Sequence, residues 1–254
     1  MALTKNVIPI LEYDDAQTAV LMPNRTEGYR FPECAVFPFL GEEVDRFARD
    51  NGCPVIGEFV SATKVFPIYQ VTHQGRDICL CQAPVGAAPA AQLLDWLIGC
   101  GVRKIISAGS CGVLVPMEEN VFLIPEEALR DEGTSYHYLP PSRTVTADPD
   151  GVRAIERAFE KNGVHYTKCK TWSTDGFFRE TRDMVEYRKG EGCAVVEMEC
   201  AALIACARFR GVTFGQFFYT ADTLADVEAH DDRGWGMDSL PTALRLCLDA
   251  AAEL

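Results

Sequence analysis

The sequence lacks any apolar run long enough to span a membrane, and residues 1–6 do not place a charged stretch before an apolar one. The first absence argues against a transmembrane protein and the second against a secretory signal peptide. Basic residues are scarce, since 24 Lys and Arg stand against 37 Asp and Glu, for a formal net charge of -13. Because such a surface repels polyphosphate, we expect no nucleic-acid partner. The expected compartment is the cytoplasm.

Signatures of metal and cofactor sites are also missing. The 11 cysteines are spread from Cys34 to Cys247 without a CxxC pair or a paired metal-ligand spacing. The glycine-rich segment 109–112 is neither a GxGxxG dinucleotide fingerprint nor a Walker A lysine loop. We therefore expect no metal and no organic cofactor, and we interpret the cysteines as small buried apolar residues in a reducing compartment.

The chain does contain a regular alternation of strand-like and helix-like segments. Hydrophobic residues make up 48% of its 254 residues, which is enough for one large core. Strands are expected at 34–38, 65–71, 78–81, 104–108, 121–125, 165–172, 194–197 and 212–219, and helices at 41–51, 88–100, 148–162, 198–210 and 240–252. This order predicts an α/β fold, a single three-layer domain whose central sheet is mixed, mainly parallel and flanked by helices. Residues 1–33 are interpreted as an N-terminal extension and 34–254 as the domain.

Two carboxylates lie where an apolar strand meets an apolar helix. Glu197 and Glu199 flank Met198 within this junction. Charges at the mouth of a core element are costly unless they are paired or used. A carboxylate suits a pair of sugar hydroxyls and a methionine can pack on a ribose ring, but acids in a helix's first turn also act as caps. Both interpretations stay open for the two glutamates.

Two further strand ends carry candidate site residues. The apolar run 217–219 leads to Asp222, which could protonate a leaving base or form an Asx-type turn. The run 104–108 leads into Gly109-Ser110-Cys111-Gly112, which is either an anion-binding glycine turn or a plain tight turn. Because ligands gather at the carboxyl ends of strands in α/β sheets, we expect these ends to face one cleft.

Taken together, these segments resemble the nucleoside phosphorylase/nucleosidase superfamily, which includes purine nucleoside phosphorylase, uridine phosphorylase and the methylthioadenosine/S-adenosylhomocysteine nucleosidases. Residues 104–112 look like its central glycine motif and 196–202 like its ribose motif, while 221–222 stand where the family has a Ser-Asp pair. Residues 173–178 resemble the segment that supplies a base-stacking aromatic. The resemblance runs in consistent order from about Cys34 to the C-terminus, so residues 1–33 fall outside it.

The resemblance implies that the protein cleaves the N-glycosidic bond of a nucleoside. By it, Glu199 would bind the ribose hydroxyls, Met198 would pack on the sugar, and Glu197 would help to hold one end of the pocket. Asp222 would interact with the leaving base, Phe177 would stack on it, and Ser110 with Gly109 would face phosphate or the nucleophilic water. This assignment agrees with the chemistry, because nearby carboxylates stabilise a cation-like sugar and an acid helps the base to depart.

The match breaks where the phosphorylases hold phosphate. Ser107 stands where they have an arginine, Glu43 lies near the place of a second, and Lys64 near that of a third, which a neighbouring subunit supplies. Replacing Arg by Glu beside a phosphate dianion turns attraction into repulsion. Residues 41–44 also resemble an acidic loop of the nucleosidases, in which a glutamate activates water. Glu43 is thus either a general base for hydrolysis or a solvated residue in a helix's first turn.

Three functions therefore stay open. The favoured one is phosphorolysis to free base and ribose 1-phosphate, with inorganic phosphate as co-substrate; Asp222 favours a purine, although loop 131–137 is similar to one in uridine phosphorylases. The second is a phosphate-independent nucleosidase that uses water activated by Glu43. The third is a nucleoside-binding protein without turnover, because a fold does not determine a function. The resemblance also implies a homo-oligomer, in which Lys64 would act on a neighbour's site.

Overall fold

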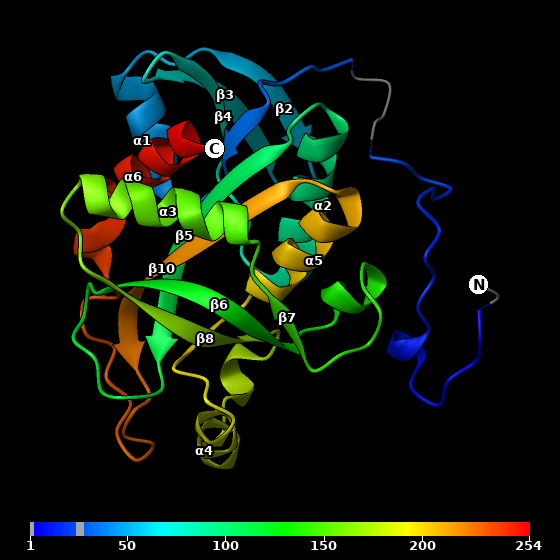
Figure 1. The fold of residues 1–254 in the computed structure, drawn as a ribbon, viewed down its shortest axis with the longest axis vertical. Coiled ribbons are helices and arrows are strands. Elements are labelled where there is room, and N and C mark those ends of the chain that lie inside the picture. Colours follow the sequence, from blue (N-terminus) through cyan, green and yellow to red (C-terminus); the bar gives the residue numbers. More distant parts are fainter. Residues whose placement is uncertain (1–2, 24–27) are drawn as a thin grey trace.

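The computed structural model describes residues 3–23 and 28–254. The strands in these residues are β1 (Cys34–Val36), β2 (Val55–Val60), β3 (Val65–His73), β4 (Arg76–Leu80), β5 (Lys104–Val113), β6 (Phe122–Asp131), β7 (Thr144–Thr146), β8 (Tyr166–Thr174), β9 (Val195–Glu197) and β10 (Thr213–Thr223). The α-helices are α1 (Glu42–Asp50), α2 (Ala87–Gly99), α3 (Pro149–Lys161), α4 (Arg182–Gly190), α5 (Cys200–Arg210) and α6 (Leu240–Glu253). Figure 1 shows their arrangement.

All of these strands belong to one sheet, in the order β10-β6-β8-β9-β5-β1-β4-β3-β2, with β7 beside β6. Because β10 also pairs with β5, the strands β5, β10, β6, β8 and β9 close into a ring. The prediction of a mixed sheet is confirmed. Parallel and antiparallel strand pairs are equally frequent among the described strands, and the two longest pairings, β5 with β10 and β6 with β8, are parallel.

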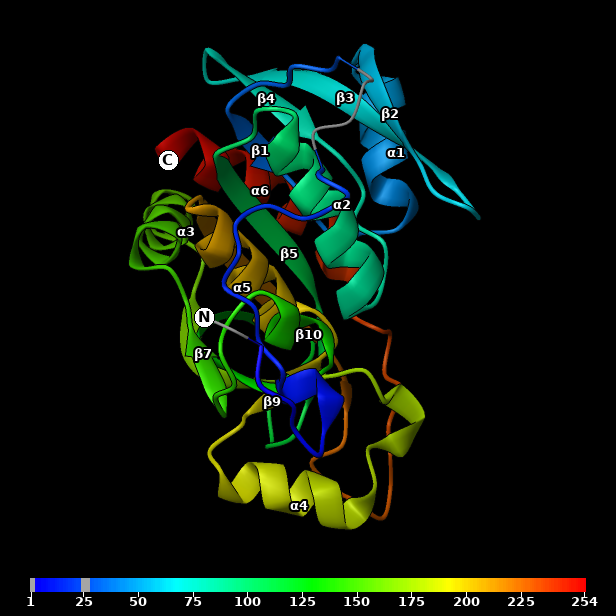
Figure 2. The ribbon, with the colours of Figure 1, turned by 90° about the vertical axis from the view of Figure 1, so that its right-hand side faces the viewer.

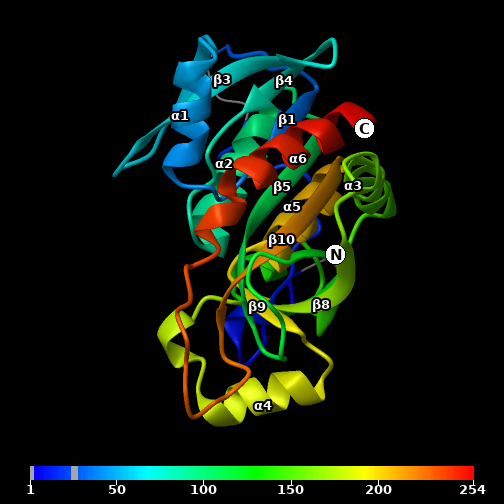
Figure 3. The ribbon, with the colours of Figure 1, turned by 90° about the vertical axis from the view of Figure 1, so that its left-hand side faces the viewer.

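Helices cover both faces of the sheet and give the three layers that the sequence predicts. Helices α2 and α5 pack against each other on one face, and α6 packs with α1 and α3 on the other (Figures 2 and 3). The sheet divides the apolar core accordingly, with Leu97 and Leu203 on the first side and Phe159 and Leu244 on the second. Helix α4 lies apart from both layers, at the end of the molecule that holds the loops after β8 and β10.

The glycine segment 109–112 is not a turn, and that part of the sequence interpretation is wrong. Strand β5 continues through it, with Gly109, Ser110 and Cys111 paired to residues 218–220 of β10. The glycines are needed because neighbouring side chains approach the strand closely. A Cβ on Gly112 would lie 2.9 Å from Leu224 Cδ1 and 3.1 Å from Asp222 Oδ1. The lack of a side chain therefore makes room for Asp222 rather than for a change of chain direction.

Segment 3–23 lies along the outside of the domain (Figure 1). The Tyr13 hydroxyl donates to the Tyr138 carbonyl oxygen at 3.4 Å, and Arg210 donates to the Gln17 carbonyl oxygen at 3.3 Å. Within the described ranges, no helix combines the length and apolar character needed to cross a membrane. All of the cysteines are buried except the half-buried Cys53, which confirms their interpretation as core residues.

Candidate active site

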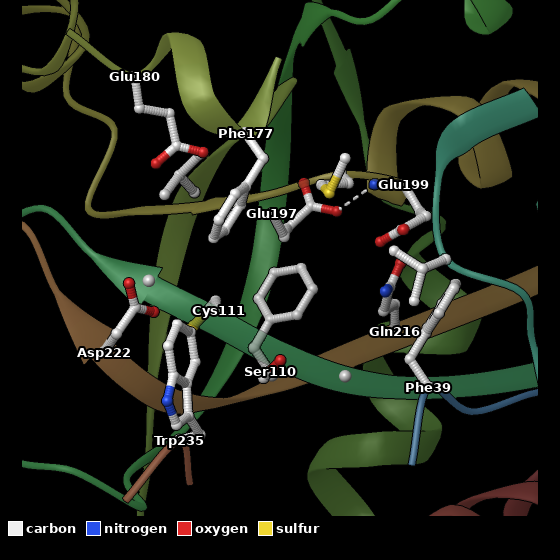
Figure 4. A pocket seen from close by; sticks show the side chains of 16 residues that line it. Phe39, Ser110, Cys111, Phe177, Glu180, Glu197, Glu199, Gln216, Asp222 and Trp235 are labelled. Atoms are coloured by element: carbon white, nitrogen blue, oxygen red, sulfur yellow. Dashed lines mark hydrogen bonds between the residues drawn. The ribbon is translucent and has the colours of Figure 1, made fainter. Parts of the chain in front are cut away.

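A pocket of about 230 Å³ lies beside the ends of β5 and β9 and along β10. Its floor is formed by 109–112 of β5, by 196–199 at the β9–α5 junction, and by β10 residues that include Asp222. Phe39, Phe177 and Trp235 stand around it (Figure 4). The strand ends that the sequence singled out therefore face one cleft, as expected, because β5 pairs with both β9 and β10.

Four hydrogen bonds from neighbouring protein groups hold the Glu197 carboxylate. One carboxylate oxygen accepts from the Thr171 and Ser173 hydroxyls at 3.1 and 2.5 Å, and the other accepts from the backbone N–H groups of Glu199 and Cys200 at 2.7 and 2.6 Å. Burial raises its pKa, and these four hydrogen bonds oppose that rise. The contacts tie β9 to β8 and cap the first turn of α5. Glu197 therefore has the helix-cap role that the sequence left open.

Glu199 is the carboxylate of this pair that is directed into the pocket (Figure 4). Its side chain is buried, and one oxygen accepts a hydrogen bond from the Gly86 N–H at 2.5 Å. Gly86 has a φ of 103°, which glycine adopts without strain, so its N–H can meet the carboxylate at the start of α2. Burial, and then the charge of Glu197, raises the pKa of Glu199 to about 8.

Asp222 reaches the opposite side of the pocket from the end of β10. It is buried, and its Oδ2 lies 2.8 Å from His230 Nε2. The hydrogen bond with Asp222 raises the pKa of His230, and His230 Nδ1 lies 3.3 Å from Asp232 Oδ1. An acid beside an imidazole that favours its charged form is a pair able to hold, and then pass on, a proton.

Three further residues at the Asp222 side belong to loops. Phe177 stands in a 3-10 turn (Phe177–Arg179) after β8, and its ring faces the pocket as the sequence predicted. Glu180 follows it, and burial, then the charge of Asp222, raises its pKa to about 7. Trp235 comes from the loop before α6. Sequence reasoning missed Glu180, Trp235 and His230, because loop residues carry no periodic signal.

Gln216 is the other residue that the sequence interpretation missed. It lies on β10 at the Glu199 side of the pocket, and its side chain is 4% exposed. A signal existed, because this glutamine is a polar residue inside the apolar run 214–219 and is separated from Asp222 by an even number of positions. On a regular strand that spacing predicts a shared face. The pairing of β10 is irregular between Thr220 and Thr223, and both side chains line the pocket.

Three residues named from the sequence lie outside the pocket lining. Glu43 is in the first turn of α1, buried and paired with Arg46, and it lines a different hollow beside α6. Lys64 is exposed in the β2–β3 turn, with Nζ 5.1 Å from the Phe66 ring centre. Ser107 is fully buried and donates to the Phe37 carbonyl oxygen at 2.7 Å. The structure therefore brings neither Glu43 nor Lys64 to the cleft of its own chain.

An α/β fold with several carboxylates in a pocket at its strand ends is typical of an enzyme. Comparison with known proteins identifies the family. The phosphorylase superfamily matches residues 33–253. The chain is 28% identical to a guanosine phosphorylase of Halorubrum lacusprofundi, over 87% of this chain and 94% of that protein. The chain therefore belongs to the phosphorylase superfamily, and the expectation of an enzyme of this family is confirmed.

Solved structures share the fold. A purine nucleoside phosphorylase of Toxoplasma gondii superposes with a TM-score of 0.75 at 18% identity, over 90% of this chain and 92% of that chain. An AMP nucleosidase of Bacteroides thetaiotaomicron superposes with a TM-score of 0.70 at 23% identity, over 87% and 88%. At these identities the likeness establishes the architecture, and the chemistry has to be argued from the pocket itself.

Proposed function

We propose that the protein cleaves the N-glycosidic bond of a purine ribonucleoside, with inorganic phosphate as the acceptor. The observation that carries this proposal is the placement of acids at opposite sides of one pocket. Asp222 lies with Phe177 and Trp235 at one side and Glu199 at the other (Figure 4), and Met198, which precedes Glu199 in the chain, also lines the pocket. An acid among aromatic rings suits a departing base, and a carboxylate beside a thioether suits a sugar.

The proposed reaction breaks the bond between the sugar's C1′ and N9 of the purine and forms a bond between C1′ and a phosphate oxygen. The electron pair of the broken bond goes to the base, and N7 accepts a proton from the Asp222–His230 pair, whose 2.8 Å contact keeps that proton available. The sugar becomes cation-like in the transition state, and the carboxylates around it stabilise that charge. The similarity to a guanosine phosphorylase supports both the purine and the phosphate.

Phosphate needs a positive partner that the pocket of one chain does not supply. No Lys or Arg lines the pocket within 3–23 and 28–254, whereas Glu180, Glu197, Glu199 and Asp222 do. The β2–β3 hairpin projects from the body of the domain (Figure 2), and Lys64 stands exposed in its turn. We propose that the protein works as a homo-oligomer in which Lys64 of one copy approaches phosphate held near Ser110 and Gly109 of another.

Hydrolysis is the second candidate, and the same acidic lining favours it. Four carboxyl groups line the pocket without a described cation, so no positive charge attracts a phosphate dianion there, whereas a neutral water molecule needs none. Glu43 faces another hollow, so water in this pocket would have to be activated by a different base. The half-buried Glu180, with its pKa raised to about 7, is the carboxylate best suited to take a proton near neutral pH.

One assay separates the candidates. Release of free base from guanosine, inosine and adenosine is measured with and without phosphate, and the sugar product is identified. Phosphorolysis predicts release that requires phosphate and yields ribose 1-phosphate. Equal rates without phosphate, with free ribose as the product, would establish hydrolysis instead. Binding of these nucleosides without any base release would show that the site has lost turnover.

A matched pair of lysine variants tests the role of a second copy. Lys64→Ala should raise the KM for phosphate about tenfold while the KM for the nucleoside stays the same, because a charge-assisted contact to phosphate is lost. Lys161→Ala, on the outer surface of α3, serves as the control. An unchanged phosphate KM in the Lys64 variant would remove that residue from the site.

A further inference from the structure

Gln216 carries an unpartnered polar atom that the proposed reaction does not use. Its side chain is 4% exposed, and its Oε1 is buried without any hydrogen-bond partner. Leaving a buried acceptor unpaired costs about 1–3 kcal/mol, so such an atom in a functional pocket points to a missing donor. Gln82 and Glu132 also have an unpartnered buried side-chain oxygen in the described part of the chain, but of these three residues only Gln216 lines the candidate active site.

The position of Gln216 indicates which part of a ligand it meets. Gln216, Phe218 and Asp222 follow one another along β10 and all line the pocket. A ligand whose base lies at Asp222 therefore extends past Phe218 towards Gln216. In Figure 4 the Gln216 amide points to the side of the pocket that holds the Glu199 carboxylate. Glu199 and Gln216 thus place hydrogen-bond acceptors at one end of the pocket, the Glu199–Gln216 end.

We propose that Gln216 is a specificity residue that accepts a hydrogen bond from a ribose hydroxyl and so selects ribonucleosides over deoxyribonucleosides; this inference rests on the proposed function. The unpartnered atom is an acceptor, which needs a donor. A ribose offers two adjacent hydroxyl donors, whereas a phosphate dianion has one O–H group and is otherwise an acceptor. Two adjacent acceptors, the Gln216 amide oxygen and the Glu199 carboxylate, match the two donors of a vicinal diol.

The test is the substitution Gln216→Met, which keeps the length of the side chain and removes the amide. For the wild type we expect a ribonucleoside to be used about tenfold or more better in kcat/KM than its 2′-deoxy or 3′-deoxy analogue, because a site built to bind a hydroxyl rejects a ligand without it. In Gln216→Met this preference should fall about tenfold for one of the two analogues. Gln82→Met is the matched control, since Gln82 has the same kind of unpartnered oxygen but lies outside the pocket, and its preference should not change.

Thermal unfolding of the same variants guards against a folding defect. Gln216→Met should be at least as stable as the wild type without ligand, because it removes a buried unpaired acceptor. A destabilised variant with an unchanged ribose preference would assign Gln216 to the core and overturn the proposal. A raised KM for phosphate with an unchanged ribose preference would overturn it too, by placing phosphate at this end.

The inference about Gln216 can be tested even if the protein does not cleave nucleosides. If the wild type releases no base from any nucleoside, the same ratio is measured as equilibrium affinity, by calorimetry with a ribonucleoside and its deoxy analogues. A ribose preference in binding that Gln216→Met removes would support the inference without turnover. Equal affinity of the wild type for all three ligands would overturn it.

Discussion

The two ends of the pocket are built in different ways. At the Glu199–Gln216 end these two side chains come from the β9–α5 junction and from β10 and are 7% and 4% exposed, with Phe39 of the loop after β1 beside them. At the Asp222 end the surrounding residues come from loops, and Phe177 and Trp235 are 43% and 44% exposed. Regular elements hold a side chain more firmly than loops do. We infer that selection of the sugar is fixed by the core, and that selection of the base depends on loops that tolerate change.

The acids at the two ends also differ in how firmly their hydrogen-bond partners are fixed. Glu197, at the buried end, is satisfied by four protein donors and serves the fold. Asp222 is satisfied by a half-exposed histidine that can gain or lose a proton. Two acids in similar sequence settings therefore have different partners, four fixed protein donors for Glu197 and one titratable side chain for Asp222.

The largest effect is expected at the loop-lined end. Asp222→Asn keeps the shape of the side chain but can no longer hold a negative charge beside His230, so kcat/KM for purine ribonucleosides should fall about 100-fold or more. Steady-state base release measures this. Asp232→Asn is the control, because Asp232 also contacts His230 but does not line the pocket. Wild-type rates in Asp222→Asn would make Asp222 a structural residue.

A stability measurement at the buried end should give the next largest effect. Glu197→Ala leaves two hydroxyl groups and two backbone N–H groups without their acceptor, and we expect a loss of about 3 kcal/mol in the free energy of unfolding. Urea unfolding gives the value. Asp222→Ala is the matched comparison and should lose clearly less, because Asp222 has one described partner, His230. Equal losses would break the distinction between the two ends.

The pH dependence of the unfolding free energy tests the protonation state of Glu199 at the buried end. Its pKa is raised from 4.5 to about 8 in the folded protein, so between these values the folded chain keeps a proton that the unfolded chain releases. The unfolding free energy therefore falls as pH rises from about 4.5 to 8. Glu199→Gln should unfold with less dependence on pH over this range. Parallel curves for variant and wild type would show that Glu199 is charged throughout.

The smallest effect is expected for His230→Asn. Asp222 raises the pKa of His230, so the imidazolium is present below that raised pKa and is lost as pH rises through it. Base release by the wild type should therefore decline as pH rises through the pKa of His230. In His230→Asn this alkaline limb of the pH profile should be absent, and at lower pH the rate should be about threefold to tenfold below that of the wild type. An identical limb in the variant would assign that titration to another group, with Glu180 the nearest candidate.

Much of the fold could be predicted because long apolar or periodic segments leave clear signals. The helices α1, α2, α3, α5 and α6 and most strands lie within a few residues of their expected positions. Strand β2, the short β7 and helix α4 were missed. Helix α4 buries little beyond Val185 and Arg188, so it has no strong amphipathic pattern. Closure of the sheet through β10 and β5 depends on pairing between strands far apart in the sequence, which local pattern does not encode.

The candidate site could be predicted only in part, for a related reason. Glu199 and Asp222 were conspicuous as acids at strand ends, and the family resemblance implied Met198 and Ser110; all four line the pocket. The loop residues Glu180, His230 and Trp235 were not, since only the folded chain brings them beside Asp222. Glu43 is the opposite case. Its segment resembles a catalytic loop of the nucleosidases, but in the folded chain Glu43 is paired with Arg46 and lines a different hollow. Whether Glu197, Phe177 and Lys64 act on a substrate stays a prediction.

The most direct measurement of the central claim is a crystal structure of the protein with a purine ribonucleoside and phosphate. We predict the purine between Phe177 and Trp235 with N7 within hydrogen-bond distance of Asp222, and the ribose hydroxyls on Glu199 and Gln216. Phosphate should lie at Ser110, with Lys64 of a second copy beside it. A nucleoside bound in the reverse direction, with its sugar at Asp222 and its base at Glu199, would contradict the account.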